Sequence, residues 1–319
     1  MLEVQILNLN PSFDHTGIIK HKVDGDVVRV DEVIEFCSGK GINMARVLKT
    51  LGYENYEVSN IIGGPIGKII KDSLCAEGIS SWNFMIENNS RINYALVDEI
   101  NDKTLMINEG GPLTTKKEKQ KYLEELYSWL KEKQIMVLAG SAMQGFDCKD
   151  IEEIIRKAKA KEMFVVVDTY GDFLSAGLQA GIDFLKINRK EFIAKFDSNN
   201  KQSFRLTQDF VKIFKKEKIK EVAITFDKEG ALFYKSGLAW CGKIKKNFPK
   251  YNIGSGDSFL AGYIYSLVNN FDKFKCFKIA MACVAANTLI YGAGKLKQKD
   301  VLEIEGKYIE INKYSYKVA

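Results

Sequence analysis

The sequence predicts an α/β fold with a mostly parallel central sheet that is covered by helices on both faces. Short apolar runs bounded by turn residues alternate with longer amphipathic stretches, as buried parallel strands alternate with helices. The length of 319 residues and the hydrophobic content of 46% are enough for one large core. The runs that predict strands are residues 4–9, 57–61, 135–139, 164–167, 184–187 and 221–225.

Helices are expected between these strands, because apolar residues recur there at helical spacing. One of them has a clear start signal, since Thr115 and Glu118 stand at the spacing of a capping box. The expected helices span residues 44–51, 67–77, 116–131, 150–160, 174–180, 207–216, 258–269 and 274–291.

Two segments, 16–35 and 91–107, alternate apolar and polar residues on either side of a turn. Such segments predict antiparallel hairpins. Together they would form a small sheet outside the main layers, serving as a lid over a site or as a dimer surface. The chain has no internal repeat and no Pro- or Ser-rich linker. We therefore expect one domain over residues 1–319, with a lid formed by insertions at about 12–36 and 90–108.

Composition excludes several classes of protein and site. The net charge of +6 comes from lysines spread along predicted helices, which usually face solvent, and no basic run is interleaved with aromatic residues, so nucleic-acid binding is not favoured. The only histidines are His15 and His21, which leaves little material for a histidine-based triad or metal site. The six scattered cysteines favour reduced thiols in a cytoplasmic protein. No apolar stretch is long enough for a membrane span, so no membrane partner is expected.

A glycine-rich turn, Gly-Ser-Gly-Asp at residues 254–257, precedes an apolar run. The start of a helix offers unpaired backbone N–H groups and the positive end of the helix dipole, which together favour a bound anion. A carboxylate there would repel the anion unless it removes a proton during phosphoryl transfer. We therefore interpret Asp257 as a general base beside a transferring phosphoryl group. The alternative interpretation is an ordinary N-terminal helix cap.

A second glycine-rich turn, Ser-Gly-Lys-Gly-Ile-Asn at residues 38–43, also leads into an apolar helix. Glycines allow a ligand to approach the backbone, Lys40 can neutralise a phosphate, and Asn43 can bond sugar hydroxyls. Such a turn is often only structural, and neither turn matches the usual mononucleotide or dinucleotide fingerprints.

A third candidate follows the predicted strand 184–187, where Asn188 and Glu191 stand three residues apart. At the carboxyl end of a parallel strand, this pair could hold Mg²⁺ directly or through water. The alternative is a simple helix cap with an acid in the first turn.

In their order along the chain, these segments resemble the ribokinase-like carbohydrate kinase family, and most of all its phosphofructokinase-B group of 1-phosphofructokinases and tagatose-6-phosphate kinases. The resemblance extends from about residue 6 to about residue 294. It rests on Asn-Pro-Ser-Phe-Asp at 10–14, the turn and helix at 38–52, Ser-Arg-Ile-Asn at 90–93, Ile-Asn-Glu-Gly-Gly-Pro at 107–112, Ala-Gly-Ser at 139–141, Asn-Arg-Lys-Glu at 188–191 and Gly-Ser-Gly-Asp at 254–257.

The resemblance implies a three-layer α/β fold with a β-sheet lid, a homodimer formed through that lid, and transfer of the ATP γ-phosphoryl group to a phosphorylated ketose. It implies ATP and Mg²⁺ as cofactors and makes a monovalent cation a further candidate. By position, Asp257 would be the base, and the N–H groups of Gly254, Ser255 and Gly256 the anion hole. The implied substrate contacts are Asp14, Gly39, Lys40, Asn43, Ser141 and Arg91. Of these, Arg91 would bind the substrate phosphate, with Arg29 as its partner. The implied nucleotide contacts are Lys186, Asn188, Thr225, Gly230 and Asn287, with Glu191 on the Mg²⁺ side.

The chain departs from the family pattern at Ser38, Ile187, Asp227, Asn252 and residues 142–145. Asp227 matters most, because a carboxylate near the ATP phosphates would lower affinity unless it turns outward. The turn at 38–43 and the sequence Ile-Asn-Glu at 107–109 favour fructose 1-phosphate as acceptor over tagatose 6-phosphate. Two other readings stay open: a kinase of an unphosphorylated sugar or nucleoside, and a sugar-phosphate-binding regulator without catalysis.

Overall fold

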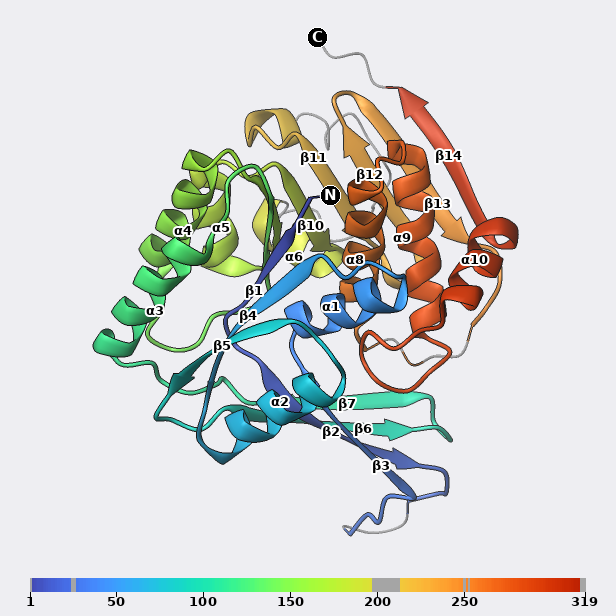
Figure 1. Ribbon diagram of the computed structural model, residues 1–319. Coiled ribbons are helices and arrows are strands. Elements are labelled where there is room, and N and C mark those ends of the chain that lie inside the picture. The colour runs from blue at the N-terminus through green and yellow to red at the C-terminus, as the bar shows by residue number, and fades with distance from the viewer. Residues whose placement is uncertain (1, 24–26, 197–212, 249–250, 252, 316–319) are drawn as a thin grey trace.

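The structure is a computed structural model that describes residues 2–23, 27–196, 213–248, 251 and 253–315. Within these residues, ten strands form the central sheet in the order β14-β13-β12-β11-β10-β9-β8-β1-β4-β5 (Figure 1). The six predicted strands are all present and pair in parallel: β1 (Val4–Asn8), β4 (Tyr56–Gly63), β8 (Ile135–Ala139), β9 (Phe164–Asp168), β10 (Phe184–Asn188) and β11 (Glu221–Thr225).

Four strands at the two edges of the central sheet were not predicted. β5 (Ser81–Ile86) pairs in parallel with β4 at one edge. At the other edge, β12 (Ala231–Lys235), β13 (Leu238–Ile244) and β14 (Ile309–Ser315) continue the sheet by antiparallel pairing. Gly230 precedes β12 with a φ of 109°, and a Cβ there would lie 2.0 Å from the carbonyl oxygen of Gly242, so only glycine fits.

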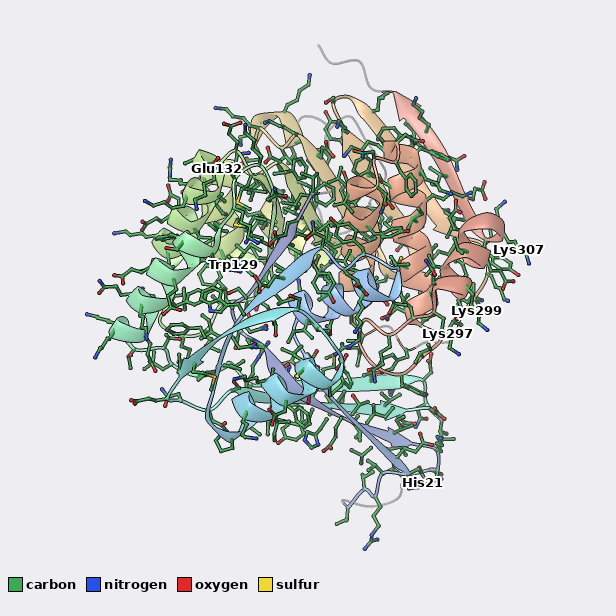
Figure 2. All side chains as sticks on the ribbon, viewed as in Figure 1. His21, Trp129, Glu132, Lys297, Lys299 and Lys307 are labelled. Atoms are coloured by element: carbon green, nitrogen blue, oxygen red, sulfur yellow. The ribbon has the colours of Figure 1, made fainter. Side chains whose placement is uncertain are left out.

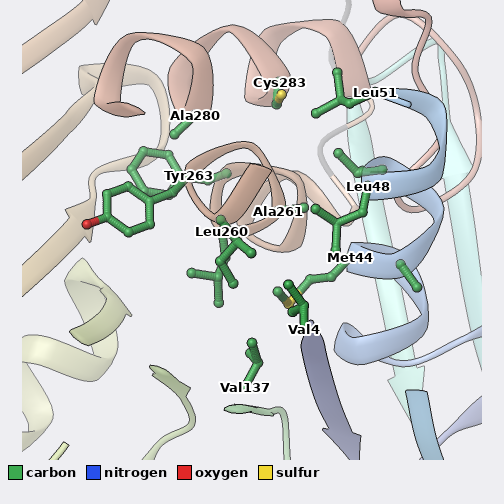
Figure 3. Packing of buried hydrophobic residues seen from close by; sticks show 14 of the residues in the cluster. Val4, Met44, Leu48, Leu51, Val137, Leu260, Ala261, Tyr263, Ala280 and Cys283 are labelled. Atoms are coloured by element: carbon green, nitrogen blue, oxygen red, sulfur yellow. The ribbon is translucent and has the colours of Figure 1, made fainter. Parts of the chain in front are cut away.

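Helices cover both faces of the sheet, and one apolar cluster lies on each face, which confirms the predicted three-layer fold. One face carries α1 (Lys40–Thr50), α2 (Gly64–Ala76), α8 (Ser255–Val268), α9 (Lys273–Asn287) and α10 (Gln298–Lys307). The other carries α3 (Lys116–Trp129), α4 (Cys148–Ala160), α5 (Gly171–Ala180) and α6 (Arg189–Phe196). Figure 3 shows α8 enclosed by α9, α1 and the strands, above Val4 and Val137.

The predicted helices are present with shifted ends. The capping box of Thr115 and Glu118 is formed at the start of α3. The helix predicted at 274–291 ends at Asn287 instead, and the chain then passes through Gly292 and Gly294, both with positive φ. Part of the helix predicted at 207–216 lies outside the described residues, and 213–216 are helical. Figure 2 shows Lys299 and Lys307 of α10 at the surface, as expected for solvated lysine faces.

A separate four-stranded sheet lies below the central one in Figure 1, in the order β3-β2-β6-β7. It is built from the two predicted hairpins, β2 (Ser12–Ile19) with β3 (Glu32–Ser38), and β6 (Arg91–Asp98) with β7 (Lys103–Asn108). The hairpins join through parallel pairing of β2 with β6. The turn expected around residues 24–26 lies outside the described residues. No helix in the described part of the chain has the length and apolar character needed to cross a membrane.

Candidate active site

The candidate site lies where the carboxyl ends of β9 and β10 meet the first turns of α1 and α8. Parallel α/β sheets bind their ligands at such strand ends. Asp168 is the last residue of β9, Lys186 lies near the end of β10, and Lys40 begins α1. Asp257 stands in the first turn of α8. The structure therefore brings residues from four distant stretches of sequence to one place.

The first turn of α8 is free of side-chain caps. Gly254 occupies the N-cap position with a φ of 80°, and no side chain bonds the cap. The first backbone hydrogen bond of the helix runs from Ser258 N to Gly254 O at 2.9 Å, so the preceding N–H groups are not used in this way. The alternative reading of this turn as an ordinary capped helix start is therefore wrong. The turn is suited to receive an anion.

Asp257 is held by an amide from the other glycine-rich turn. Asn43 Nδ2 donates to Asp257 Oδ2 at 2.8 Å, and Asp257 is only 7% exposed. Burial is the largest influence and raises the pKa of the Asp257 carboxyl to about 6, with the charge of Asp168 acting in the same direction. Lys40, Lys186 and the Asn43 amide oppose that rise. A carboxyl with this pKa is mostly ionised at pH 7 and remains able to accept a proton.

Asp168 organises the two lysines beside this turn. Lys40 Nζ lies 2.5 Å from Asp168 Oδ1, and Lys186 Nζ lies 3.0 Å from Asp168 Oδ2. Burial alone would raise the pKa of Asp168, but the two lysines outweigh it and hold that pKa below its usual range. Sequence reasoning missed Asp168, although an acid closing the run Phe-Val-Val-Val-Asp was a usable signal.

Lys186 approaches the uncapped first turn of α8 itself. A Cβ at residue 256 would lie 2.6 Å from Lys186 Nζ, so Gly256 leaves room for the ammonium group. The turn thus combines backbone N–H groups with a positive side chain. This combination is well suited to a phosphate group.

Asn287 supports the same turn from behind. It is fully buried, and its Oδ1 accepts from Ser258 Oγ at 3.0 Å and from Gly294 N at 2.9 Å. Its Nδ2 donates to Ile253 O at 2.9 Å and lies 3.3 Å from Ser255 Oγ. In this structure the side chain is engaged in holding the turn, rather than facing an open nucleotide site.

The second glycine-rich turn is packed against β1. A Cβ at Gly39, where φ is 129°, would lie 2.7 Å from Asn8 Oδ1, and one at Gly41 would lie 2.7 Å from Asn8 Cβ. Both glycines are therefore required for close packing. This packing fixes the start of α1 and directs Lys40 and Asn43 toward the α8 turn.

A polar cluster at the base of the small sheet gathers other predicted substrate residues. Asp14 Oδ1 accepts from Ser12 Oγ at 2.6 Å and from Asn93 Nδ2 at 3.0 Å. Burial raises the pKa of the Asp14 carboxyl. Asn10 Nδ2 lies 3.2 Å from Ser141 Oγ, which ties this cluster to the central sheet. Asn93 was not singled out from the sequence.

Arg91 is turned toward backbone carbonyls at the edge of this cluster. Its Nη1 donates to Glu109 O at 3.0 Å and its Nη2 to Asn10 O at 2.8 Å. Its Nε is buried and makes no hydrogen bond to the described residues. Arg29 lies on the exposed segment between β2 and β3, and no hydrogen bond between described residues joins it to Arg91.

The residues predicted to face the nucleotide lie at the ends of neighbouring strands. Asn188 and Thr225 end β10 and β11 and are paired in register. Asn188 N donates to Glu191 Oε2 at 2.9 Å, and Glu191 N donates to Asn188 Oδ1 at 2.9 Å, so the two residues cap the start of α6. Asp227, which departs from the family pattern, is exposed and has a φ of 50°, a left-handed conformation that aspartate adopts more readily than most residues other than glycine.

The donor set fits a metal that arrives with phosphates. In the described part of the chain, no three His, Cys, Asp or Glu side chains gather as a metal site. Mg²⁺ is usually held by one or two carboxylates, waters and substrate phosphates, not by a complete protein cage. Glu191 could supply a carboxylate of this kind.

Comparisons with known proteins identify the family. The family model described as pfkB family carbohydrate kinase matches residues 7–299. The chain belongs to the pfkB family of carbohydrate kinases. This carbohydrate kinase is therefore a phosphotransferase that acts on a sugar hydroxyl, and such kinases use ATP with a divalent metal.

Two curated relatives resemble the kinase over most of its length. It is 26% identical over 286 residues to the 1-phosphofructokinase of Escherichia coli K12, covering 88% of this chain and 89% of that protein. It is 26% identical over 323 residues to the tagatose-6-phosphate kinase of Staphylococcus epidermidis, covering 93% of this chain and 99% of that protein.

Solved structures confirm the fold. Phosphofructokinase-2 from Escherichia coli in complex with substrates and products matches with a TM-score of 0.86 at 23% identity, covering 96% and 99% of the two chains. Other structures of that protein are described as a potassium complex and as a tetrameric inhibited form. Ribokinase from Thermotoga maritima matches with a TM-score of 0.75 at 16% identity, covering 96% and 100%.

The buried Asp257 should make the stability of the kinase depend on pH. Its pKa is raised from 3.8 to about 6, so its favourable contribution is present below about pH 4 and is lost as pH rises through 6. We therefore compare the free energy of unfolding of Asp257→Asn with that of the wild type. The difference should shift in favour of the variant by about 3 kcal/mol between acidic and neutral pH. Urea denaturation at a series of pH values measures this difference.

The control is Asp147→Asn. Backbone N–H groups at the start of α4, above all that of Asp150, lower the pKa of Asp147. The Asp147→Asn variant should therefore lose stability relative to the wild type as pH rises. A pH-independent difference between Asp257→Asn and the wild type would contradict the buried, ionising carboxyl.

Proposed function

We propose that the protein is an ATP- and Mg²⁺-dependent hexose-phosphate kinase that converts fructose 1-phosphate to fructose 1,6-bisphosphate. The observation that carries the proposal is the placement of Asp257, buried in an uncapped helix turn and flanked by Lys186 and Lys40. Catalysis of phosphoryl transfer depends mainly on positioning and on neutralising charge, and this arrangement supplies both.

Asp257 acts as general base in the proposed mechanism. The 6-hydroxyl oxygen of the sugar forms a bond to the γ-phosphorus of ATP, the bond to the β–γ bridging oxygen breaks, and ADP leaves with the electron pair. The hydroxyl proton passes to Asp257. The N–H groups of Gly254, Ser255 and Gly256 stabilise the migrating phosphoryl group, and Lys186 and Lys40 offset its charge.

The nucleotide would lie across the ends of β10 and β11. Asn188, Thr225 and Gly230 line this edge, and Asn287 acts by holding the α8 turn. Glu191 would hold Mg²⁺ directly or through water. Because Asp227 is exposed, its carboxylate is free to point into solvent. A monovalent cation is a further candidate cofactor, since a structural neighbour is described with potassium.

The acceptor is assigned from the chemistry of the polar cluster and from the relatives. Asp14, Asn43 and Ser141 would bond the sugar hydroxyls, with Gly39 and Lys40 beside them. Arg91 would bind the substrate phosphate by exchanging its backbone carbonyl partners for phosphate oxygens, with Arg29 as a second cation. The names of the two relatives leave fructose 1-phosphate and tagatose 6-phosphate as the leading acceptors.

A coupled ADP-release assay over a panel of acceptors tests the function. The panel contains fructose 1-phosphate, tagatose 6-phosphate, fructose 6-phosphate, fructose, ribose and a nucleoside. Highest kcat/KM with fructose 1-phosphate is expected, and preference for an unphosphorylated acceptor would reject the hexose-phosphate assignment. If the protein binds a sugar phosphate but turns over no acceptor, the result would identify it as a sugar-phosphate-binding regulator without catalysis.

Replacing the base gives a second expected result. Asp257→Asn should lower kcat by about 100-fold or more, because general base catalysis contributes roughly that amount, while ATP still binds. Steady-state kinetics and ATP titration measure the two properties. Asp147→Asn serves as control and should keep normal turnover, and near-normal turnover by Asp257→Asn would reject its role.

The proposed phosphate contact predicts a change in KM. Arg91→Ala should raise KM for fructose 1-phosphate by about 10-fold to 100-fold, the range for losing charged hydrogen bonds, and leave KM for ATP nearly unchanged. Arg156→Ala, which removes an exposed arginine paired with Glu152, is the matched control. An unaltered KM for the sugar phosphate would favour an unphosphorylated acceptor.

We also propose a homodimer formed through the small sheet. Among the described residues, Val33, Tyr94, Leu105 and Ile107 are 57%, 45%, 59% and 57% exposed. The strand register places Val33 with Leu105, and Tyr94 with Ile107, in neighbouring rows on one face of this sheet. A contiguous exposed apolar face of this kind is typical of an interaction surface.

The dimer proposal predicts a change in oligomeric state. The double variant Leu105→Glu with Ile107→Glu should be monomeric by analytical ultracentrifugation, whereas the wild type should be dimeric, because charges on this face would have to be desolvated. Leu302→Glu is the control, since Leu302 is 64% exposed on α10, away from the small sheet. A double variant with the mass of the wild type would place the interface elsewhere.

A further inference from the structure

Arg46 is a buried arginine that neither the family resemblance nor the proposed mechanism assigns. It lies on α1, three residues after Asn43, and is 7% exposed. A guanidinium carries five N–H donors and no acceptor. Burying it is costly unless those donors are paired.

All five donor directions of Arg46 have partners. Its Nε donates to Glu77 Oε2 at 2.6 Å, and its Nη2 donates to Glu77 Oε1 at 2.9 Å. Nη2 also donates to Cys37 O at 3.0 Å. Nη1 donates to Ala293 O at 2.8 Å and lies 3.3 Å from Asn43 Oδ1. The guanidinium therefore has no donor left for a ligand, and its contacts define what it holds in place.

Three of these partners lie in or beside the two glycine-rich turns of the site, Asn43 within the turn at 38–43 and Cys37 and Ala293 next to the two turns. Cys37 lies in β3, directly before the turn at 38–43. Ala293 packs behind the other turn, because a Cβ at Gly254 would lie 2.7 Å from Ala293 Cα. The next residue, Gly294, is so close to α1 that a Cβ would lie 2.4 Å from Asn43 O. Arg46 thus links the sugar side of the site to the anion-binding side.

The contact with Asn43 also fixes which way its amide faces. Arg46 can only donate, so the amide oxygen of Asn43 must be the atom that faces it. Ser38 Oγ donates to the same oxygen at 3.4 Å. The NH₂ group is therefore directed to Asp257 Oδ2, at 2.8 Å. A reversed amide would set a carbonyl oxygen against the carboxylate.

We propose that Arg46 is a positioning residue for the catalytic base: its guanidinium, neutralised by Glu77, fixes the amide of Asn43 so that it donates to Asp257. The inference rests on the proposed function in assigning Asp257 as the base. Glu77 is suited to neutralise Arg46. Burial alone would raise the pKa of its carboxyl, but the hydrogen bonds and the charge of Arg46, together with the Cys37 thiol and Lys295, hold that pKa below its usual range.

The charged and titratable groups that face Asp257 come from three elements. They are Lys40 on α1, Asp168 on β9 and Lys186 on β10, and Asn43 adds a hydrogen bond from a neutral group. Among the groups that face Asp257, the one that Arg46 contacts is the Asn43 amide, whereas none of its hydrogen bonds goes to the three charged groups. Loss of that hydrogen bond should raise the pKa of the base.

The test compares Arg46→Lys with Lys49→Met. A lysine keeps the positive charge beside Glu77 but lacks the planar guanidinium that reaches five acceptor atoms on four residues. Lys49 contacts the carbonyls of Glu77 and Gly78, so its loss disturbs the same junction of α1 and α2 without touching Asn43. The readouts are kcat, KM and the acidic limb of kcat/KM against pH.

For Arg46→Lys we expect kcat to fall about 10-fold or more, KM for ATP to stay nearly constant, and the acidic limb to move up by about one pH unit, as loss of a hydrogen bond to a charged group predicts. Lys49→Met should leave the limb in place. Adding Arg46→Lys to Asn43→Ala should shift the limb no further. An unmoved limb in Arg46→Lys, or a further shift in the double variant, would overturn the proposal.

A readout without catalysis separates this inference from the proposed function. The pH midpoint of the stability difference between Asp and Asn at position 257 should rise in the Arg46→Lys background, whether or not the protein is a kinase of fructose 1-phosphate. An unchanged midpoint would also overturn the positioning role. If Arg46→Lys does not fold, the neutral pair Arg46→Gln with Glu77→Gln allows the same measurement, since it leaves no uncompensated buried charge.

Discussion

The pairing of one buried carboxylate with two lysines is the interaction on which the site depends. Asp168 contacts Lys40 from α1 and Lys186 from β10, and it is 1% exposed. Without it, two ammonium groups would be confined near one another beside the uncapped start of α8. With it, the kinase can keep the positive charge of both lysines next to the uncapped start of α8. The same carboxylate contributes to the raised pKa of Asp257.

The sequence was most informative where strands are buried on both faces. Such strands form continuous apolar runs, and all six of those runs became parallel strands of the central sheet. The two outermost strands, β5 and β14, mix polar and apolar residues, as in Ile-Glu-Ile-Asn-Lys-Tyr-Ser of β14, and this pattern was not recognised. The early start of α1 at Lys40 was also missed, because Gly41 is a poor helix former that is needed here for packing against Asn8.

Local motifs located the two glycine-rich turns, but they could not show how the turns meet. The hydrogen bond between Asn43 and Asp257 joins residues 214 positions apart, and no local pattern contains it. Arg46 and Asn93 were given no role for the same reason, since each acquires its importance from distant partners. Asp168 differs from them, because the acid at the end of an apolar run was a local signal that was not used. Conversely, Asn287 was assigned to the nucleotide by resemblance, and the structure shows its amide engaged within the protein.

The chain passes between the two sheets four times in the described residues, from β1 to β2, from β3 to α1, from β5 to β6 and from β7 to α3. Asn10, Arg91 and the segment at 109–110 lie on three of these crossings and are hydrogen-bonded to one another. The crossings would act as hinges for any movement of the small sheet. A ligand that drew the Arg91 guanidinium away from its carbonyl partners would release two hinges together, so that occupancy of the site and mechanical freedom of the sheet would be coupled.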